Sequence, residues 1–136
     1  MIVVDTNLLV YLYVEGEHTA RAERVLRKDA AWAAPLLWRS EFRNVLAGLV
    51  KGRALRLEEA IVIVGQAEQG MAGREYSVVS HEVLQLAARS GCSAYDCEFV
   101  ALARDLGASL VTSDGQILKA FPSVAVALSR FIAAST

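Results

Sequence analysis

The chain has 136 residues, of which 54% are hydrophobic and 21% charged, with two prolines and nine glycines. This length is that of one domain, and the composition excludes a disordered segment, a collagen-like chain and a disulfide scaffold. The formal net charge is only −1, from 14 basic and 15 acidic residues, which at first sight argues against a nucleic-acid partner. We therefore expect a single globular domain over residues 1–136.

The sequence contains no recognisable targeting or membrane segment. No stretch approaches the run of about 18 apolar residues that a membrane helix needs, and the first residues lack the basic start of a signal peptide. Cys92 and Cys97 fall on different faces of an expected helix, so we expect two small buried residues rather than a disulfide or a zinc site. These features predict a cytoplasmic protein of a reducing compartment.

Short β-branched runs alternate with longer helical patterns along the chain. A strand at 2–4 is followed by three possible helix caps at 5–7, a helix at 17–29 and a strand at 32–34 that Pro35 ends. Helices at 36–51 and 57–69 precede a strand at 76–79 and a helix that Ser80 caps and that runs to Arg89. Ser93 caps the next helix, which reaches 106 before Gly107.

The last part of the chain continues this alternation. A strand is expected at 109–112, a short helix at 114–120 and an edge strand at 124–126, whereas residues 129–136 carry no motif. Strands separated by helices need crossover connections, which favour parallel pairing with helices on both faces. The sequence therefore predicts a three-layer α/β/α fold around a mostly parallel sheet.

Two aspartates stand directly after predicted strands. Asp5 follows the strand at 2–4, and Asp114 follows the strand at 109–112. In open α/β sheets, ligands bind outside the carboxyl ends of the strands, so both side chains are candidates for a binding site. An aspartate between a strand and a helix is also a common N-cap, so either residue alone has a structural explanation.

Two further acids lie on predicted helix faces. Glu41 shares a face with apolar residues, where a carboxylate is uncommon unless it is paired or holds a metal; a surface position or an ion pair with an arginine is the alternative. Asp96 also faces the apolar side of its helix, although it could instead complete a capping box with Ser93. Glu98 lies about 160° away around the same helix, so we expect it at the surface.

Four carboxylates at one end of the sheet would repel one another unless a cation compensates their charge. Carboxylate oxygens without a neighbouring imidazole or thiolate suit Mg²⁺ or Mn²⁺, which serve phosphoryl chemistry by activating water. The pattern thus indicates a candidate metal site formed by Asp5, Glu41, Asp96 and Asp114.

Four stretches, in this order, resemble the PIN-domain ribonucleases, and within that group the VapC-type toxins of toxin–antitoxin pairs. They are VDTNLLV at 4–10, SEFRNVL at 40–46, AYDCEFVALA at 94–103 and LVTSD at 110–114. Together they cover nearly the whole chain, from Ile2 to about Pro122. Four motifs in order are far more specific than any one of them.

The resemblance implies a five-stranded parallel sheet between helices, with an acidic pocket at the strand ends. It assigns metal ligation to four acids: Asp5 and Asp96 most directly, with Glu41 and Asp114 completing the set. It adds Thr112, and also Asn7 and Ser113, as contacts to these acids or to the scissile phosphate, although capping explains the last two equally well. The implied reaction is hydrolysis of an RNA phosphodiester by water activated with one or two Mg²⁺ or Mn²⁺ ions, which leaves a 5′-phosphate.

The resemblance also implies partners: a homodimer, and a VapB-like antitoxin whose tail covers the active site with an arginine or lysine among the carboxylates. Trp32, Trp38 and the helix at 57–69 could supply an interface, although each also suits the core. Three other functions stay open: a receiver-like magnesium-binding domain, a catalytically silent interaction domain, and a PIN nuclease of RNA processing without a toxin role.

The near-zero net charge is the sum of two opposed regions. Residues 19–56 carry nine basic and three acidic residues, a net charge of +6, and the remainder carries −7. A basic region beside an acidic pocket suits a phosphate backbone held near a metal, although many of these side chains also suit solvated helix faces. The net charge therefore does not exclude RNA.

Overall fold

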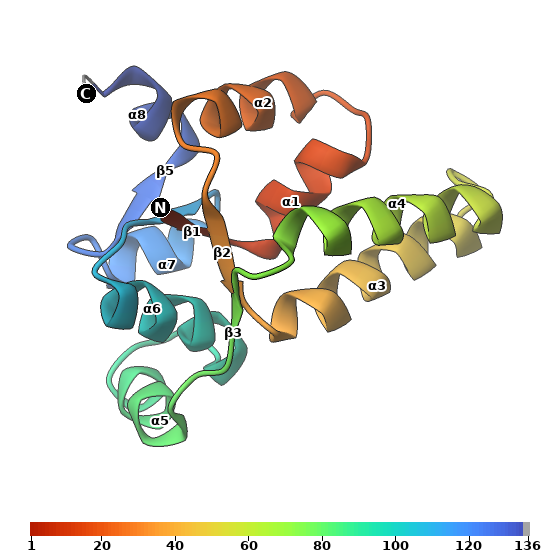
Figure 1. Cartoon of the computed structure of the whole chain (residues 1–136). Coiled ribbons are helices and arrows are strands. Elements are labelled where there is room, and N and C mark those ends of the chain that lie inside the picture. Colours follow the sequence, from red (N-terminus) through yellow and green to blue (C-terminus); the bar gives the residue numbers. More distant parts are fainter. Residues whose placement is uncertain (135–136) are drawn as a thin grey trace.

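A five-stranded parallel sheet forms the middle layer of the protein, here a computed structural model that describes residues 1–134 (Figure 1). The strands, in the spatial order β3-β2-β1-β4-β5, are β1 (Ile2–Val4), β2 (Trp32–Pro35), β3 (Glu75–Tyr76), β4 (Leu110–Thr112) and β5 (Ala125–Ala127). Every pairing is parallel, including Val3 with Ala33 of β2 and Val3 with Leu110 of β4. The predicted three-layer α/β/α fold is confirmed.

Helices connect successive strands as crossovers, which are right-handed in nearly all such folds, and the last helix, α8, follows the last strand. They are α1 (Thr6–Tyr13), α2 (Thr19–Lys28), α3 (Leu37–Lys51), α4 (Leu57–Met71), α5 (Ser80–Ala88), α6 (Ala94–Leu106), α7 (Gly115–Ala120) and α8 (Leu128–Ala133). Helix α6 packs against β1, β2 and β4 with α5 outside it, whereas α1 to α4 cover the other face (Figure 1). Within residues 1–134, none of these helices has the length and apolar character needed to cross a bilayer.

The core explains the two tryptophans and the two cysteines. Trp32 and Trp38 are 2% and 0% exposed, so both belong to the interior and neither supplies an interface. Cys92 and Cys97 are buried free thiols, as the sequence predicts. The expected cap of α6 is also present: the Ser93 hydroxyl accepts a hydrogen bond from the Asp96 amide at 3.1 Å.

Strand β3 is shorter than predicted. The β-branched residues Val78 and Val79 favour a strand, but the partner strand β2 ends at Pro35. The last bond of this ladder runs from the Leu36 amide to the Tyr76 carbonyl, at 2.9 Å, and the chain then turns into α3. Residues after Tyr76 therefore have no strand to pair with.

Two further predictions are corrected at helix ends. Ser80 is the first residue of α5 rather than its cap, because Val79 occupies the N-cap position. Helix α8 was not predicted, since its sequence has no clear periodicity. It is held by a contact from elsewhere in the chain, because Lys28 of α2 donates hydrogen bonds to the Phe131 and Ala134 carbonyls at the end of α8. The other boundaries agree within two residues, and positions 135 and 136 lie outside the described residues.

An ion-pair network fixes the start of α3 against β3 and α4. Glu75 accepts hydrogen bonds from the Arg39 guanidinium at 2.6 and 2.8 Å and from the Trp38 indole at 2.8 Å. Glu68 of α4 pairs with Arg39 at 3.2 Å and with Arg43 at 3.6 Å. The Arg39 hydrogen bonds lower the pKa of Glu75. Both arginines therefore pair within the fold, although 57% of the Arg43 side chain remains exposed.

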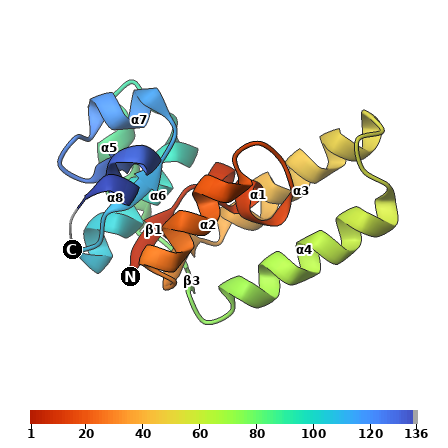
Figure 2. The same ribbon diagram turned by 90° about the horizontal axis from the view of Figure 1, so that it is seen from above.

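Helices α3 and α4 lie antiparallel and extend beyond the rest of the molecule as an arm (Figure 2). The fully buried side chains of α3, namely Trp38, Phe42 and Leu46, all lie toward its start. Between the two helices is an apolar cavity of about 340 Å³, which Leu57 and Ile61 line. Because Leu57 and Ile61 are 59% and 60% exposed, the arm presents an open apolar groove.

Candidate active site

The four predicted acids line one cavity of about 250 Å³ at the carboxyl end of β1 and β4. Its remaining lining residues come from α1, α3, α6 and α7: Thr6, Asn7, Asn44, Val45, Phe99 and Ile117. No lysine, arginine or histidine among residues 1–134 lines this cavity. The sequence prediction that these carboxylates meet at one sheet edge thus agrees with the geometry.

Asp5 is both a helix cap and a tie between strands. Its Oδ1 accepts a hydrogen bond from the Leu8 amide at 2.9 Å, which caps α1. Its Oδ2 accepts bonds from the Thr112 hydroxyl at 2.5 Å and from the Ser113 amide at 3.3 Å, both at the end of β4. Both explanations given for Asp5, capping and a position at the site, therefore hold at once.

Glu41 enters the cavity from the first half of α3. The Thr6 hydroxyl donates a hydrogen bond to its Oε1 at 2.6 Å, and the neighbouring arginines Arg39 and Arg43 pair elsewhere, with Glu68 and Glu75. The alternative of an ion pair with an arginine thus does not apply to Glu41.

Asp96 and Asp114 complete the cavity from two helix N-termini. Asp96 lies in the first turn of α6, after its cap Ser93. Asp114 caps α7, with its Oδ1 accepting bonds from the amides of Gln116 at 2.9 Å and Ile117 at 3.0 Å. Like Asp5, Asp114 therefore combines a capping role with a place in the cavity.

The carboxylates affect one another's ionisation. Burial is the largest cause that raises the pKa of Asp5, Glu41 and Asp96. The charge of Asp114 further raises the pKa of Asp5 and Asp96, and the charges of Asp96 and Asp5 raise that of Glu41. Hydrogen bonds from Thr112 and Thr6 act in the opposite direction on Asp5 and Glu41. The net effect is a cavity in which full ionisation is unfavourable without a cation.

The three predicted supporting residues take different positions. Thr112 is fully buried, and its hydroxyl both donates to Asp5 and accepts from the Asp114 amide at 3.0 Å, so it joins two of the acids. Asn7 is exposed and lines the cavity. Ser113 contributes its backbone amide to Asp5, but its side chain does not line the cavity.

Sequence reasoning missed two residues of this site. Thr6 is buried and holds Glu41, a residue 35 positions away, so no local pattern could reveal the pair. Asn44 lies one helical turn after Glu41 and lines the same cavity. Because residues three apart share a helix face, the spacing of Asn44 from Glu41 could have predicted that it faces the same cavity.

The prediction for Glu98 is corrected. Its direction on α6 suggested a surface position, but the residue is only partly exposed. Burial, followed by the charge of Glu41, raises its pKa. A helical wheel orients a side chain around its own helix and cannot show that Glu41 of α3 lies nearby.

The donor set fits a hard divalent cation by its chemistry: four carboxylates and two amide side chains surround a cavity that contains no protein cation. Across residues 1–134, however, no three acidic, histidine or cysteine side chains stand in an arrangement that would already hold one ion. A bound cation would therefore have to draw the carboxylates together.

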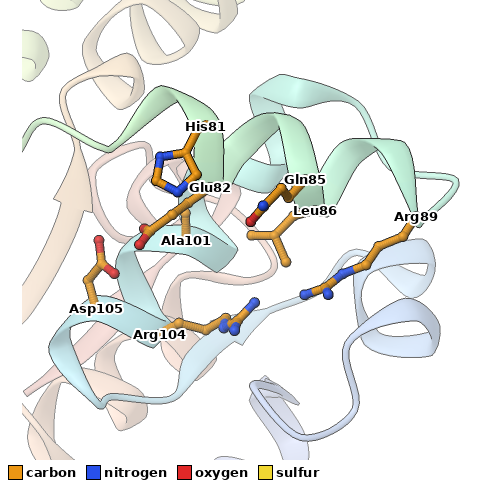
Figure 3. A pocket seen from close by; sticks show the side chains of 8 residues that line it. All are labelled: His81, Glu82, Gln85, Leu86, Arg89, Ala101, Arg104 and Asp105. Carbon is orange, nitrogen blue, oxygen red and sulfur yellow. The ribbon is translucent and has the colours of Figure 1, made fainter.

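A second polar cavity, of about 290 Å³, lies between α5 and α6 (Figure 3). Its charged side chains are Glu82 and Asp105 on one side and Arg89 and Arg104 on the other, with His81 beside Glu82. Opposite charges are therefore balanced there, unlike in the cavity of the four acids. None of the predicted site residues lines it.

Residues 2–122 match the model of the family described as PIN domain. The chain belongs to the PIN domain family. A curated relative of this PIN domain, Ribonuclease VapC3 from Pyrobaculum aerophilum, is 29% identical over 126 residues, which cover 90% of this chain and 96% of that protein.

Solved structures share the architecture of this PIN domain. The crystal structure of FitAcB from Neisseria gonorrhoeae has a TM-score of 0.75 at 17% identity, covering 95% of this chain and 99% of that one. A toxin–antitoxin complex from Klebsiella pneumoniae has a TM-score of 0.67 at 18% identity, covering 94% and 98%. At such identities these matches establish the fold, and the resemblance inferred from the four motifs is confirmed at the level of the family.

Proposed function

We propose that this PIN domain is a Mg²⁺-dependent endoribonuclease that acts as the toxin of a toxin–antitoxin pair. The observation that carries the proposal is the cavity lined by Asp5, Glu41, Asp96 and Asp114. Burial and neighbouring carboxylates raise the pKa of Asp5, Glu41 and Asp96, and no lysine, arginine or histidine of residues 1–134 lines the cavity. Similarity to Ribonuclease VapC3 supports the nuclease part of the proposal. Similarity to the Klebsiella toxin–antitoxin complex supports the toxin part.

The residues divide the chemistry among them. Asp5, Glu41, Asp96 and Asp114 would hold the cation, which supplies charge neutralisation at the scissile phosphate and activation of the attacking water. An ionised carboxylate of the set accepts the proton of that water. Thr112 and Thr6 orient Asp5 and Glu41 through their hydroxyl groups. The exposed amides of Asn7 and Asn44 are placed to donate hydrogen bonds to a phosphate at the mouth of the cavity.

The test of the nuclease role is cleavage of RNA by the purified chain in Mg²⁺. We expect products with a 5′-phosphate and a 3′-hydroxyl, because water attacks the phosphorus directly; a 2′,3′-cyclic phosphate would contradict this mechanism. Expression without an antitoxin should arrest growth of a bacterial host. Cleavage without growth arrest would favour an RNA-processing nuclease, and absence of both would reject the proposal.

The proposal includes an antitoxin and a homodimer as partners. An antitoxin tail with an arginine or lysine matches the uncompensated carboxylates of the cavity. The open groove between α3 and α4 offers a second contact, because Leu57 and Ile61 expose more apolar surface than a solvated helix face needs.

We expect Ile61→Asp to weaken the complex with the cognate antitoxin by at least about thirtyfold, since a charge in the middle of an apolar contact costs on the order of 2 kcal/mol. Titration calorimetry with the protein encoded beside this gene measures the effect. The matched control is Glu58→Gln, an exposed change on the same helix outside the groove. Equal affinity of Ile61→Asp and the parent would exclude the groove from the interface.

A further inference from the structure

The turn that joins α3 to α4 holds a strained arginine. Arg53 has a φ of +61°, and among residues 1–134 it is the only residue other than glycine with a positive φ. Glycine takes this left-handed conformation without steric cost, and asparagine tolerates it better than a long side chain does. Arginine at this position is therefore an unfavourable choice for the fold alone.

Nothing in the fold accounts for the Arg53 side chain. It is exposed, and within residues 1–134 it makes no ion pair and no side-chain hydrogen bond. Its basic neighbours do have local roles. Lys51 lies in the last turn of α3, where a cation interacts favourably with the helix dipole, and Arg56 pairs with Glu59 at 3.3 Å at the start of α4.

Helix α3 connects this turn to the acidic cavity. Glu41, Asn44, Gly48 and Lys51 follow one another at spacings of three and four residues, so they share a face of the helix. The first two line the acidic cavity, Gly48 is exposed, and Lys51 is exposed at the edge of this face, where it also lines the apolar groove between α3 and α4. A Cβ built on Gly48 would meet no atom within 4 Å, so this face is open at Gly48, between the cavity and the end of the arm.

The length of α3 matters for the electrostatics. Ten residues separate Glu41 from Lys51, a distance of about 15 Å along a helix. This is more than the Debye length of about 8 Å at physiological ionic strength. The cations at the end of the arm can therefore attract a phosphate backbone, although the carboxylates of the cavity repel it.

We propose that Arg53, together with Lys51, binds the phosphate backbone of a single-stranded RNA that lies along α3 from the acidic cavity to the end of the arm (Figure 2). The inference rests on the proposed nuclease function and adds to it a contact several nucleotides from the cleaved bond. Arg53 is then a substrate-positioning residue, whose exposed charge lies in the turn at the end of the arm.

The test compares Arg53→Asn, which suits the backbone and removes the charge, with Arg53→Lys, which keeps the charge. Binding of a fluorescent single-stranded RNA of about ten nucleotides is measured by anisotropy over a range of salt, in a protein that also carries Asp96→Asn so that it cannot cut. We expect Arg53→Asn to raise the Kd about three- to tenfold and to lower the log–log salt slope by about 0.7, the value for one lost phosphate contact to a single strand. Arg53→Lys should keep the Kd and the salt slope of the parent.

Arg130→Ala is the matched control, because Arg130 is an exposed arginine of α8, at the other end of the molecule from the arm (Figures 1 and 2). It should bind RNA like the parent. A thermal unfolding midpoint of Arg53→Asn at or above that of the parent excludes misfolding as the cause.

An unchanged Kd and salt slope in the double variant Arg53→Asn with Lys51→Ala would overturn the inference. So would a loss of antitoxin affinity without a loss of RNA affinity, which would make the turn a protein contact. If the variants bind RNA normally while the otherwise unchanged chain cuts it, only this inference fails. If that chain neither binds nor cuts RNA, the proposed function fails as well.

Discussion

Replacing Asp96 by asparagine is expected to lower kcat/KM for RNA cleavage at least about a hundredfold, because even residues that only support metal ligands cost ten- to a hundredfold when changed. The same change should leave the free energy of unfolding equal or higher. Burial and the charge of Asp114 raise the pKa of Asp96, so its ionised form opposes folding at neutral pH, and asparagine removes that charge at the same shape.

Cleavage kinetics and thermal unfolding of the same preparations measure both effects. Asp105→Asn is the control, since it makes the same chemical change on the same helix, at an exposed residue that lines the other cavity. Its activity should equal that of the parent. Cleavage by Asp96→Asn at the parent rate would place the active site elsewhere or reveal a contaminating nuclease.

Removal of divalent cations should abolish cleavage, and return of Mg²⁺ or Mn²⁺ should restore it, because no basic side chain of residues 1–134 lines the cavity to balance its carboxylates. Binding of the cation should also stabilise the fold. At a Mg²⁺ concentration ten times the Kd, the free energy of unfolding rises by about 1.4 kcal/mol. Thermal unfolding in EDTA and in Mg²⁺ tests this without reference to activity.

The stabilisation of the fold by Mg²⁺ should increase with pH. Asp5, Glu41 and Asp96 have pKa values raised above 3.8, 4.5 and 3.8 in the folded chain. Their contribution to stability is therefore complete below those values and is lost as the pH rises through the raised pKa of each group. Because the cation binds the ionised groups, its stabilising effect should increase over the same window. If Mg²⁺ raises the free energy of unfolding of the double variant Glu41→Gln with Asp96→Asn as much as that of the parent, the cation binds elsewhere.

The acids of the site could be predicted from the sequence because the fold imposes their meeting. Asp5 directly follows β1, and Asp114 lies two residues after the end of β4. These strands are neighbours in a parallel sheet, so both side chains emerge at the same edge. Glu41 and Asp96 could be placed by helical periodicity, since each shares a face with apolar residues of its own helix. These local patterns made the acids candidates, and the resemblance in four ordered motifs was needed to choose a shared site over capping or surface positions.

Other features depend on contacts that no local pattern contains. The hydroxyl of Thr6 meets Glu41 only because α1 packs against α3. Strand β3 stops at Tyr76 although valines follow, because β2 has ended. Glu98 faces away from Asp96 on α6 and still experiences the charge of Glu41. Pairing partners and neighbouring helices decide these outcomes, and one sequence read by itself does not supply them.

The two ends of helix α3 differ in local stability, because its side chains are buried unevenly along its length. The first part holds Glu41 among fully buried side chains, whereas the last five residues, 47–51, contain no fully buried side chain. Regions with few buried contacts open locally at low free energy, while well-packed regions exchange their amide protons only in larger openings. The end of the arm can therefore open and re-form while the carboxylates stay in place. If the chain binds and cuts RNA as proposed, the arm could adjust to RNA of different shapes without displacing the carboxylates of the cavity.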